Sequence, residues 1–223
     1  MKRISVLVAF AVLALSLTVT AQKRGKDEFP NKEYWQTVSE RAAKIVDTMN
    51  LEVPQKQQVQ DLIAAQYYRL NGIHDGTDAE IKKVKETLAD KAEAEKAVAK
   101  LNAGRDKQLA KLHKSYLKDL SKELTPEQVE AVKDGMTYSV CPNTYAAYLD
   151  MLPSLTAEQK KYILDALTEA REKAMDAGSS KDKHAWFGKY KGRINNYLSK
   201  AGYDMNKESK AWQERLKAKG VEL

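Results

Sequence analysis

Cysteine, histidine and proline are scarce in this sequence of 223 residues, which contains one Cys, three His and five Pro. A single cysteine, Cys141, excludes an intramolecular disulfide, so the fold has to be stabilised by packing. We interpret Cys141 as a small buried side chain rather than a reactive thiol. His74, His113 and His184 do not have the mutual spacing of metal ligands, so we predict no metal site and no cofactor.

Familiar catalytic motifs are absent from the sequence as well. It contains no phosphate-binding P-loop, no serine nucleophile elbow and no zinc-protease motif. A carboxylate pair for glycoside hydrolysis can be identified only once the fold is known. The sequence therefore leaves open whether the protein is an enzyme.

Only one long apolar run is present, and it lies at the N-terminus. Lys2 and Arg3 precede the apolar residues 4–17, and small residues up to Ala21 follow, which is the pattern of a secretory signal peptide. We predict a signal peptide over residues 1–21, with cleavage near Ala21. The run is too short to favour a permanent membrane anchor. The protein is thus expected to be periplasmic or secreted.

No alternating, strand-like pattern follows the apolar run. From Glu33 onward, apolar residues recur at three- and four-residue spacing, which is typical of helices. The remaining length suits one domain with its own core. We predict an all-α fold, an antiparallel helical bundle, in a single domain over residues 33–223 that follows a flexible leader over residues 22–32.

Two features of the helical pattern set the expected architecture. A helix over residues 54–70 is followed by NGIHDGTD (71–78), where two glycines predict a break. Residues 78–123 contain no proline, and residues 89–97 offer no apolar side chain larger than Ala. We expect one long protruding helix or a helical hairpin here, with its bend at the Asn-Ala-Gly of residues 102–104.

Three segments repeat one pattern: LEVPQKQQVQD (51–61), LTPEQVEAVKD (124–134) and LTAEQKKYILD (155–165). In the second and third segments, a Thr followed three residues later by Gln predicts a capping box at a helix start. Glu52 takes the place of the Thr in the first segment, so no capping box is expected there.

The formal net charge of +7 is concentrated toward the C-terminus. Residues 178–220 contain eleven Lys or Arg and four Asp or Glu, whereas residues 124–177 contain five basic and nine acidic residues. A basic patch attracts polyanions such as anionic lipid, acidic polysaccharide or nucleic acid. Because we expect export, we predict that nucleic acid is not a partner.

Aromatic, basic and amide side chains crowd together in KHAWFGKYKGRINNYLSKAGYD (183–204). A helix that starts after a capping serine, Ser179 or Ser180, would present them as three stripes. The first is an apolar core stripe: Phe187, Ile194, Leu198 and Ala201. The second mixes aromatic, basic and amide groups: Trp186, Lys189, Tyr190, Arg193, Asn196 and Tyr197. The third consists of His184, Gly188, Lys191 and Asn195.

The second stripe, together with Asn195, has the chemistry to bind an acidic sugar. An aromatic ring stacks on the apolar face of a pyranose, Arg and Lys bind a carboxylate, and amides bond to hydroxyls. Gly188 and Gly192 indicate that a ligand or a second helix approaches the backbone closely. We predict that six residues contact the ligand: Trp186, Lys189, Tyr190, Arg193, Asn195 and Asn196. The alternative is that the rings fill the core and the cations are solvated.

If the chain is an enzyme, His184 is the expected base and a tyrosine, Tyr190 or Tyr197, the expected acid. Arg193 would neutralise a substrate carboxylate, which suits β-elimination from a uronate. No motif in the sequence demands this reaction.

His74 and Asp75 form a second candidate pair for proton transfer. Their place in a glycine-containing segment favours a capping and turn role over proton transfer. Both interpretations remain open at the level of sequence.

Two resemblances bear on function. The segments ERAAKIVDTMNL, QYYRLNGIHD, LTPEQVEAVKDGMTY and above all DAGSSKDKHAWFGKYKGRINNYLSKAGYD resemble a secreted bacterial family known as domain of unknown function 3826, over nearly the whole mature chain. This resemblance implies a mostly helical exported protein associated with gene sets for breaking down plant polysaccharides, pectin included. It implies no catalytic residue. The LTPEQ and LTAEQ segments are similar to the Leu-Thr-x-x-Gln motif of Spy/CpxP-type periplasmic chaperones, which bind unfolded protein clients.

Three functions are consistent with the sequence. The leading hypothesis is binding, or processing, of an acidic oligosaccharide through the C-terminal helix. The second is a periplasmic chaperone for unfolded protein clients. The third is a structural protein that interacts with the cell envelope.

Overall fold

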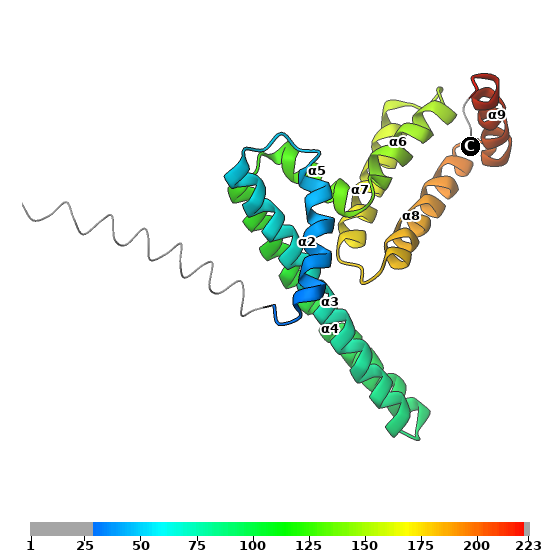
Figure 1. Cartoon of the computed structure of the whole chain (residues 1–223). Helices are drawn as coiled ribbons and strands as arrows, with labels where there is room; N and C mark the ends of the chain where they lie inside the picture. The colour runs from blue at the N-terminus through cyan, green and yellow to red at the C-terminus, as the bar shows by residue number, and fades with distance from the viewer. Residues whose placement is uncertain (1–28, 221–223) are drawn as a thin grey trace, which may run out of the picture.

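The computed structural model describes residues 29–220, which form helices and connections and contain no strand (Figure 1). This confirms the predicted all-α class. The predicted signal peptide and residues 22–28 of the predicted leader lie outside the described residues. Within the described part of the chain, no helix has the length and apolar character needed to cross a membrane. In chain order the helices are α2 (Lys32–Val46), α3 (Val53–Thr87), α4 (Lys91–Glu123), α5 (Pro126–Met136), α6 (Val140–Met151), α7 (Ala157–Met175), α8 (Ser180–Lys200) and α9 (Met205–Ala218).

The residues just before α2 pack against the body of the protein. Phe29 is 6% exposed, and its ring stacks on Trp35 with the centroids 4.3 Å apart. Asn31 caps α2 by accepting a hydrogen bond from the Tyr34 backbone N–H at 2.9 Å. The N–H of Asn31 donates to the hydroxyl of Tyr68 at 2.9 Å, which attaches the start of α2 to α3. This end of the predicted leader is therefore fixed by aromatic packing and capping.

Helices α3 and α4 pack against each other as the protruding hairpin that the sequence predicts, and its free end projects away from the other helices (Figure 1). The predicted break at residues 71–78 is wrong, because α3 continues from Val53 to Thr87. The predicted bend at residues 102–104 is also wrong, because α4 runs through it. The turn lies at residues 88–90, where Asp90 caps α4.

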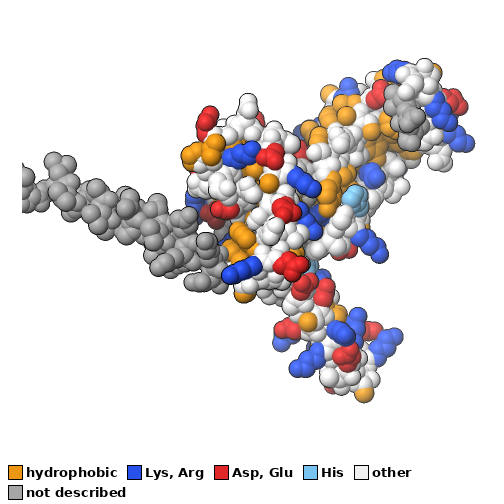
Figure 2. All heavy atoms as spheres, in the orientation of Figure 1, with side chains coloured by type: hydrophobic (Ala, Val, Ile, Leu, Met, Phe, Trp, Pro, Cys, Tyr) orange, Lys and Arg blue, Asp and Glu red, His pale blue; other side chains and the backbone are white. Residues whose placement is uncertain are grey.

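Glycine interrupts these helices less than its low helix propensity suggests. Gly72, Gly76 and Gly104 all lie inside helices, with open space where a Cβ would be. Each costs about 1 kcal/mol of helix stability relative to Ala. The packing of α3 against both α2 and α4 offsets this cost. Basic and acidic side chains are interspersed over the projecting end of the hairpin, which is therefore a solvated, charged surface (Figure 2).

The two predicted capping boxes are confirmed. Thr125 Oγ1 accepts from the Gln128 N–H at 3.3 Å, and Gln128 Oε1 accepts from the Thr125 N–H at 3.0 Å. Thr156 and Gln159 form the same pair of bonds at 3.2 and 2.9 Å. Glu52 makes no capping hydrogen bond with its side chain, as expected. These local signals fix the starts of α5 and α7.

The described helices enclose two hydrophobic cores. Helices α2 to α5, which we call the N-terminal lobe, surround a core that includes the fully buried Leu120. Helices α6 to α9, the C-terminal lobe, have a second core around Leu167. Figure 1 shows the two lobes diverging, with α5 and α7 where they meet. The contacts between α5 and α7 therefore set the position of one lobe against the other.

A buried arginine joins the two lobes. Arg171 on α7 is 4% exposed, and its guanidinium donates to Asp134 Oδ1 at 2.7 Å and to Glu130 Oε2, both on α5. Lys133 of α5 adds a second bridge, with its Nζ 3.1 Å from Glu172 Oε1 on α7. A buried charge that loses its partner is strongly destabilising. These pairs therefore hold α7 against α5.

His113 extends the ion pairs to α4. Its Nδ1 lies 2.9 Å from Asp176 Oδ2, and its Nε2 lies 3.3 Å from Glu172 Oε2. Hydrogen bonding to Asp176 and Glu172 raises the pKa of His113 to about 9, against the opposing effect of burial. Burial would raise the pKa of Glu172, but His113, Lys133 and Arg171 lower it to about 2. At neutral pH the charged His113 ring therefore bridges two carboxylates. We call the whole set the junction network: His113, Glu130, Lys133, Asp134, Arg171, Glu172 and Asp176.

The junction network predicts a pH-dependent contribution of His113 to stability. The pKa of His113 is about 9 in the folded protein and 6.5 without such partners. Its stabilisation is therefore complete below pH 6.5 and is lost as the pH rises through 9. We expect His113→Gln to lower the free energy of unfolding by about 2 to 3 kcal/mol at about pH 6, and by much less at about pH 10. Chemical denaturation of both proteins at each pH measures this; an equal cost at both would show that the charge of His113 does not contribute.

Candidate functional site

Helix α8 carries most of the predicted site residues, and one of its faces belongs to the core. Ser179 caps the helix by accepting from a backbone N–H three residues on, as predicted. Phe187, Ile194 and Leu198 are buried in the core that α8 forms with α7, which confirms most of the predicted core stripe. Ala201 is exposed, because α8 ends one residue before it.

Two members of the second stripe, Tyr190 and Arg193, are engaged by α7. Tyr190 is buried, and its hydroxyl donates to Glu169 Oε1 at 2.5 Å. Arg193 lies 3.5 Å from the other oxygen of Glu169, and its guanidinium lies 4.6 Å from the centre of the Tyr190 ring. Burial and the bond to Glu169 raise the pKa of Tyr190. Both side chains are thus positioned as partners of Glu169.

Trp186 on the same stripe is half-buried and has cations over its ring. The Nζ atoms of Lys189 and Lys173 lie 5.1 and 5.6 Å from the ring centroid. Cation–π contacts of this kind take up the ring surface on which a sugar would stack. Trp186 and Lys189 therefore contact each other and α7 rather than an open cavity.

The adjacent amides of Asn195 and Asn196 face different surroundings, since successive helical residues are about 100° apart. Asn196 is exposed. Asn195 is half-buried, and its Oδ1 accepts from the Tyr148 hydroxyl of α6 at 2.7 Å. The structure therefore does not bring the six predicted ligand-binding residues onto one surface. It places Asn195 with the third stripe, on the side of α8 that faces α6.

His184 also belongs to the side of α8 that faces α6. Its Nδ1–H donates to the Ser180 carbonyl oxygen at 2.8 Å, and its ring stacks on Tyr138 with the centroids 5.5 Å apart. Tyr190 lies about 120° around the helix from His184. Tyr197 stacks on Tyr162 of α7 with the centroids 3.9 Å apart. The candidate base thus does not share a site with either candidate acid.

His74 and Asp75 are not paired with each other. The Nε2 of His74 donates to the Asp176 carbonyl oxygen at 2.8 Å, and its ring lies against Gly178. Asp75 Oδ2 accepts from Asn71 Nδ2 at 2.6 Å on its own helix. His74 therefore ties the middle of α3 to the turn between α7 and α8.

Lys183 is a buried cation, although its sequence context is typical of a solvated lysine. It is 6% exposed, and its Nζ donates to the carbonyl oxygens of Ala174 and Met175 at 3.1 and 3.4 Å. Burial lowers the pKa of Lys183 to about 8. Its role is to satisfy the last carbonyl groups of α7.

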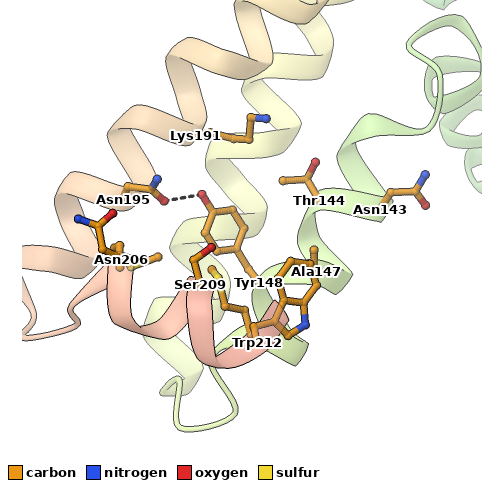
Figure 3. A pocket seen from close by; sticks show the side chains of 11 residues that line it. Asn143, Thr144, Ala147, Tyr148, Lys191, Asn195, Asn206, Ser209 and Trp212 are labelled. Atoms are coloured by element: carbon orange, nitrogen blue, oxygen red, sulfur yellow. Dashed lines mark hydrogen bonds between the residues drawn. The ribbon is translucent and has the colours of Figure 1, made fainter. Parts of the chain in front are cut away.

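A pocket of about 560 Å³ lies between α6, α8 and α9 (Figure 3). Helix α8 contributes Lys191 and Asn195, two members of the third stripe. The rest of the lining comes from α6 and α9: Asn143, Thr144, Ala147, Tyr148, Met151, Met205, Asn206, Ser209 and Trp212. The pocket thus unites side chains from α6 with those of the consecutive helices α8 and α9.

Helix α9 is held against α6 by two polar anchors. Trp212 Nε1 donates to Asp150 Oδ2 at 2.6 Å, and Trp212 also lines the pocket. Arg215 donates to the carbonyl oxygens of Asp150 and Met151, both at 3.1 Å. Asp204 caps the start of α9. These contacts fix the wall of the pocket that α9 provides.

The chemistry of the lining is polar, with one cation. Lys191 is its single ionic side chain, and the amides of three Asn and the hydroxyls of Thr144, Ser209 and Tyr148 supply donors and acceptors. Trp212 and two Met add apolar surface. Among residues 29–220, no group of three or more His, Cys, Asp or Glu side chains could hold a metal ion. The pocket is therefore suited to a ligand that carries hydroxyls and a negative charge.

The α6 and α9 residues of the pocket were not predicted from the sequence. One available signal was the third stripe, because Lys191 and Asn195 line the pocket. A second was Trp212, an aromatic side chain in a strongly charged helix. Neither signal shows which helices meet.

Substitution of Gly by Ala is expected to have opposite effects on the free energy of unfolding at two positions in this region. A Cβ at Gly178 would lie 2.8 Å from Cγ of His74, whose ring is held by its bond to Asp176, so we expect Gly178→Ala to destabilise the fold by about 1 to 3 kcal/mol. At Gly192, inside α8, no atom would lie within 4 Å, so Gly192→Ala should stabilise by about 1 kcal/mol. Urea denaturation measures both changes. Similar destabilisation by both substitutions would contradict the assigned contact.

No curated protein matches the chain significantly. The sequence model of a family described as "Protein of unknown function (DUF3826)" matches residues 35–218. The match spans both lobes and every helix that lines the pocket. The chain therefore belongs to this family of proteins of unknown function, DUF3826.

Proposed function

We propose that the protein binds an acidic glycan, and that a sugar of this glycan occupies the pocket between α6, α8 and α9. The observation that carries the proposal is the lining of the pocket, in which amides, hydroxyls, one tryptophan and one lysine converge from three helices. A sugar acid presents the complementary groups: hydroxyls, an apolar ring face and a carboxylate.

Each part of the lining has a role in this proposal. Trp212 offers apolar surface for the face of a pyranose ring. The amides of Asn143 and Asn206 donate and accept, which matches the hydroxyls of a sugar. Asn195 keeps its Nδ2 hydrogens for the ligand, because its Oδ1 accepts from Tyr148 (Figure 3).

Lys191 is the group that binds the carboxylate in this proposal. It replaces Arg193 and Lys189, the cations first predicted for that role, because Arg193 pairs with Glu169 and Lys189 lies over Trp186. An ammonium group recognises a carboxylate as a point charge, so Lys191 selects for charge more than for geometry.

The place of action in this proposal is outside the cytoplasm, in the periplasm or the medium. The signal-peptide pattern of residues 1–21 supports export. We propose binding rather than catalysis, because the candidate base His184 shares no site with Tyr190 or Tyr197.

The structure offers less support for the two other functions. Binding of unfolded clients requires extended apolar surface. The exposed large hydrophobic side chains of the described residues are Val53, Leu88, Tyr138 and Leu164, which lie on separate parts of the fold. A structural envelope role has no specific feature of the described residues in its favour.

Binding of a uronate is expected to depend on Lys191 and Asn195. We expect D-glucuronate or D-galacturonate to bind more tightly than the matching neutral sugar, as measured by calorimetry. Lys191→Met should weaken uronate binding about tenfold or more, which is about 1.4 kcal/mol. Asn195→Asp keeps an acceptor for Tyr148 but places a negative charge in the pocket, so it should abolish uronate binding.

The matched control is Lys189→Met, which removes the same charge from the side of α8 that faces away from the pocket. It should leave the affinity for the uronate unchanged. Loss of binding in this variant to the same degree as in Lys191→Met would refute the proposed site.

A further inference from the structure

We propose that the pocket is one end of a longer groove along α8, which ends at Tyr138 and His184, so that the ligand is an oligosaccharide rather than a single sugar. This inference rests on the proposed function and names the size of the ligand for the same site. It accounts for His184 and Gly188, the two members of the third stripe that do not line the pocket.

The third stripe of α8 follows α6 along its length. His184, Gly188, Lys191 and Asn195 are spaced by four, three and four residues, so they share one face of the helix. Near its start, His184 stacks on Tyr138, two residues before α6 begins. Near its end, Asn195 accepts from Tyr148, three residues before α6 ends.

The two contacts show that α6 and α8 run side by side in the same direction. Tyr138 and Tyr148 are ten residues apart on one side, and His184 and Asn195 are eleven apart on the other. Eleven residues of helix span about 16 Å. The pocket occupies the end of the proposed groove that contains Lys191 and Asn195, and α9 closes the groove at this end. The remaining part, toward His184, is long enough for further sugar units.

We assign the floor of this remaining part to the bare backbone at Gly188. Gly188 lies between His184 and Lys191 on the stripe, and a Cβ at this position would meet no atom within 4 Å. Neither a second helix nor a side chain of the described residues therefore approaches Gly188. A glycine inside a helix costs about 1 kcal/mol relative to Ala. In this proposal, the missing side chain at Gly188 leaves room for the ligand, and the lower helix stability is the consequence.

Tyr138 is held at the far end of the groove by an unusual backbone turn. Tyr138 and Ser139 both have left-handed backbone conformations, with φ of 60° and 54°, which are unfavourable for residues with a side chain. The turn is fixed by the Ser139 N–H, which donates to the Asp134 carbonyl oxygen at 2.8 Å. The turn thereby presents an aromatic ring that is 54% exposed.

The stacked pair of Tyr138 and His184 provides a platform for a second sugar. Their planes are inclined by 19° and each ring covers one face of the other, so the outer face of the exposed Tyr138 ring is the surface offered to a pyranose. The Nδ1–H of His184 is used by Ser180, which leaves Nε2 for a hydrogen bond with a sugar hydroxyl. Lys191 lies between the platform and Asn195, where a carboxylate of the chain can reach it.

The test is calorimetric titration of the mature protein with uronic acid monomer, dimer, trimer and tetramer of one linkage. We expect the affinity to rise at least tenfold from monomer to trimer or tetramer. Tyr138→Ala should remove this gain and leave the affinity for the monomer unchanged, whereas Tyr138→Phe should keep it. Equal affinity for all lengths, or an unchanged gain in Tyr138→Ala, would overturn the groove.

A second pair of variants separates an effect on binding from an effect on folding. Gly188→Leu fills the floor of the groove and should raise the melting temperature while removing the gain with ligand length. Asn196→Leu places the same side chain about 100° around the helix from Asn195, on the exposed side of α8, so it should not lower the melting temperature and should keep the gain. Loss of the gain in both variants, or in neither, would also overturn the groove.

The two proposals fail in different ways. If the monomer binds and Asn195→Asp abolishes its binding, but ligand length has no effect, only the groove is refuted. If no uronate of any length binds, the proposed function is refuted, and the groove with it.

Discussion

The arrangement of the protein depends on one buried guanidinium. Arg171 stands near the end of α7, and its hydrogen bonds to Asp134 and Glu130 fix α7 against α5. Helix α7 is also the element on which α6 and α8 pack, so the position of the C-terminal lobe follows from this contact. Burial makes the arginine costly without its carboxylates, which favours the arrangement in which all charges of the junction network are paired.

The candidate site lies in the C-terminal lobe, on helices whose positions depend on α7. Core packing of α6 and α8 on α7 leaves their neighbouring faces side by side, and α9 closes one end of the space between them. The charged stripe of α8 that stands out in the sequence is engaged by α7 through Glu169. The residues left for a ligand are the less conspicuous ones, a glycine, a lysine and an asparagine. The proposed function thus assigns recognition to the face that the core does not use.

The helical class, the caps and the core face of α8 were predictable because each is encoded within a few residues. Thr125 and Gln128 illustrate this, since both partners of the capping box lie in one helical turn. The continuity of α3 through Gly72 and Gly76 was not predictable, because it depends on packing against other helices. The same holds for the charge on His113 and for the place of Lys191 in the pocket, because the surroundings of both come from distant segments. Local pattern thus predicts the elements, and long-range contacts decide which polar residues face one another.

Helix α9 has no fully buried residue, although it supplies a wall of the pocket. Its attachment depends on the hydrogen bonds of Trp212 and Arg215 and on the partly buried Met205 and Trp212, so its detachment requires far less free energy than unfolding of either core. Only molecules with α9 attached have a complete pocket, so the apparent affinity for the proposed ligand would be the intrinsic affinity reduced by the attached fraction. Because the proposed ligand contacts both α8 and α9, its binding would in turn favour the attached state of α9. The order of the C-terminal helix would then report whether the site is occupied.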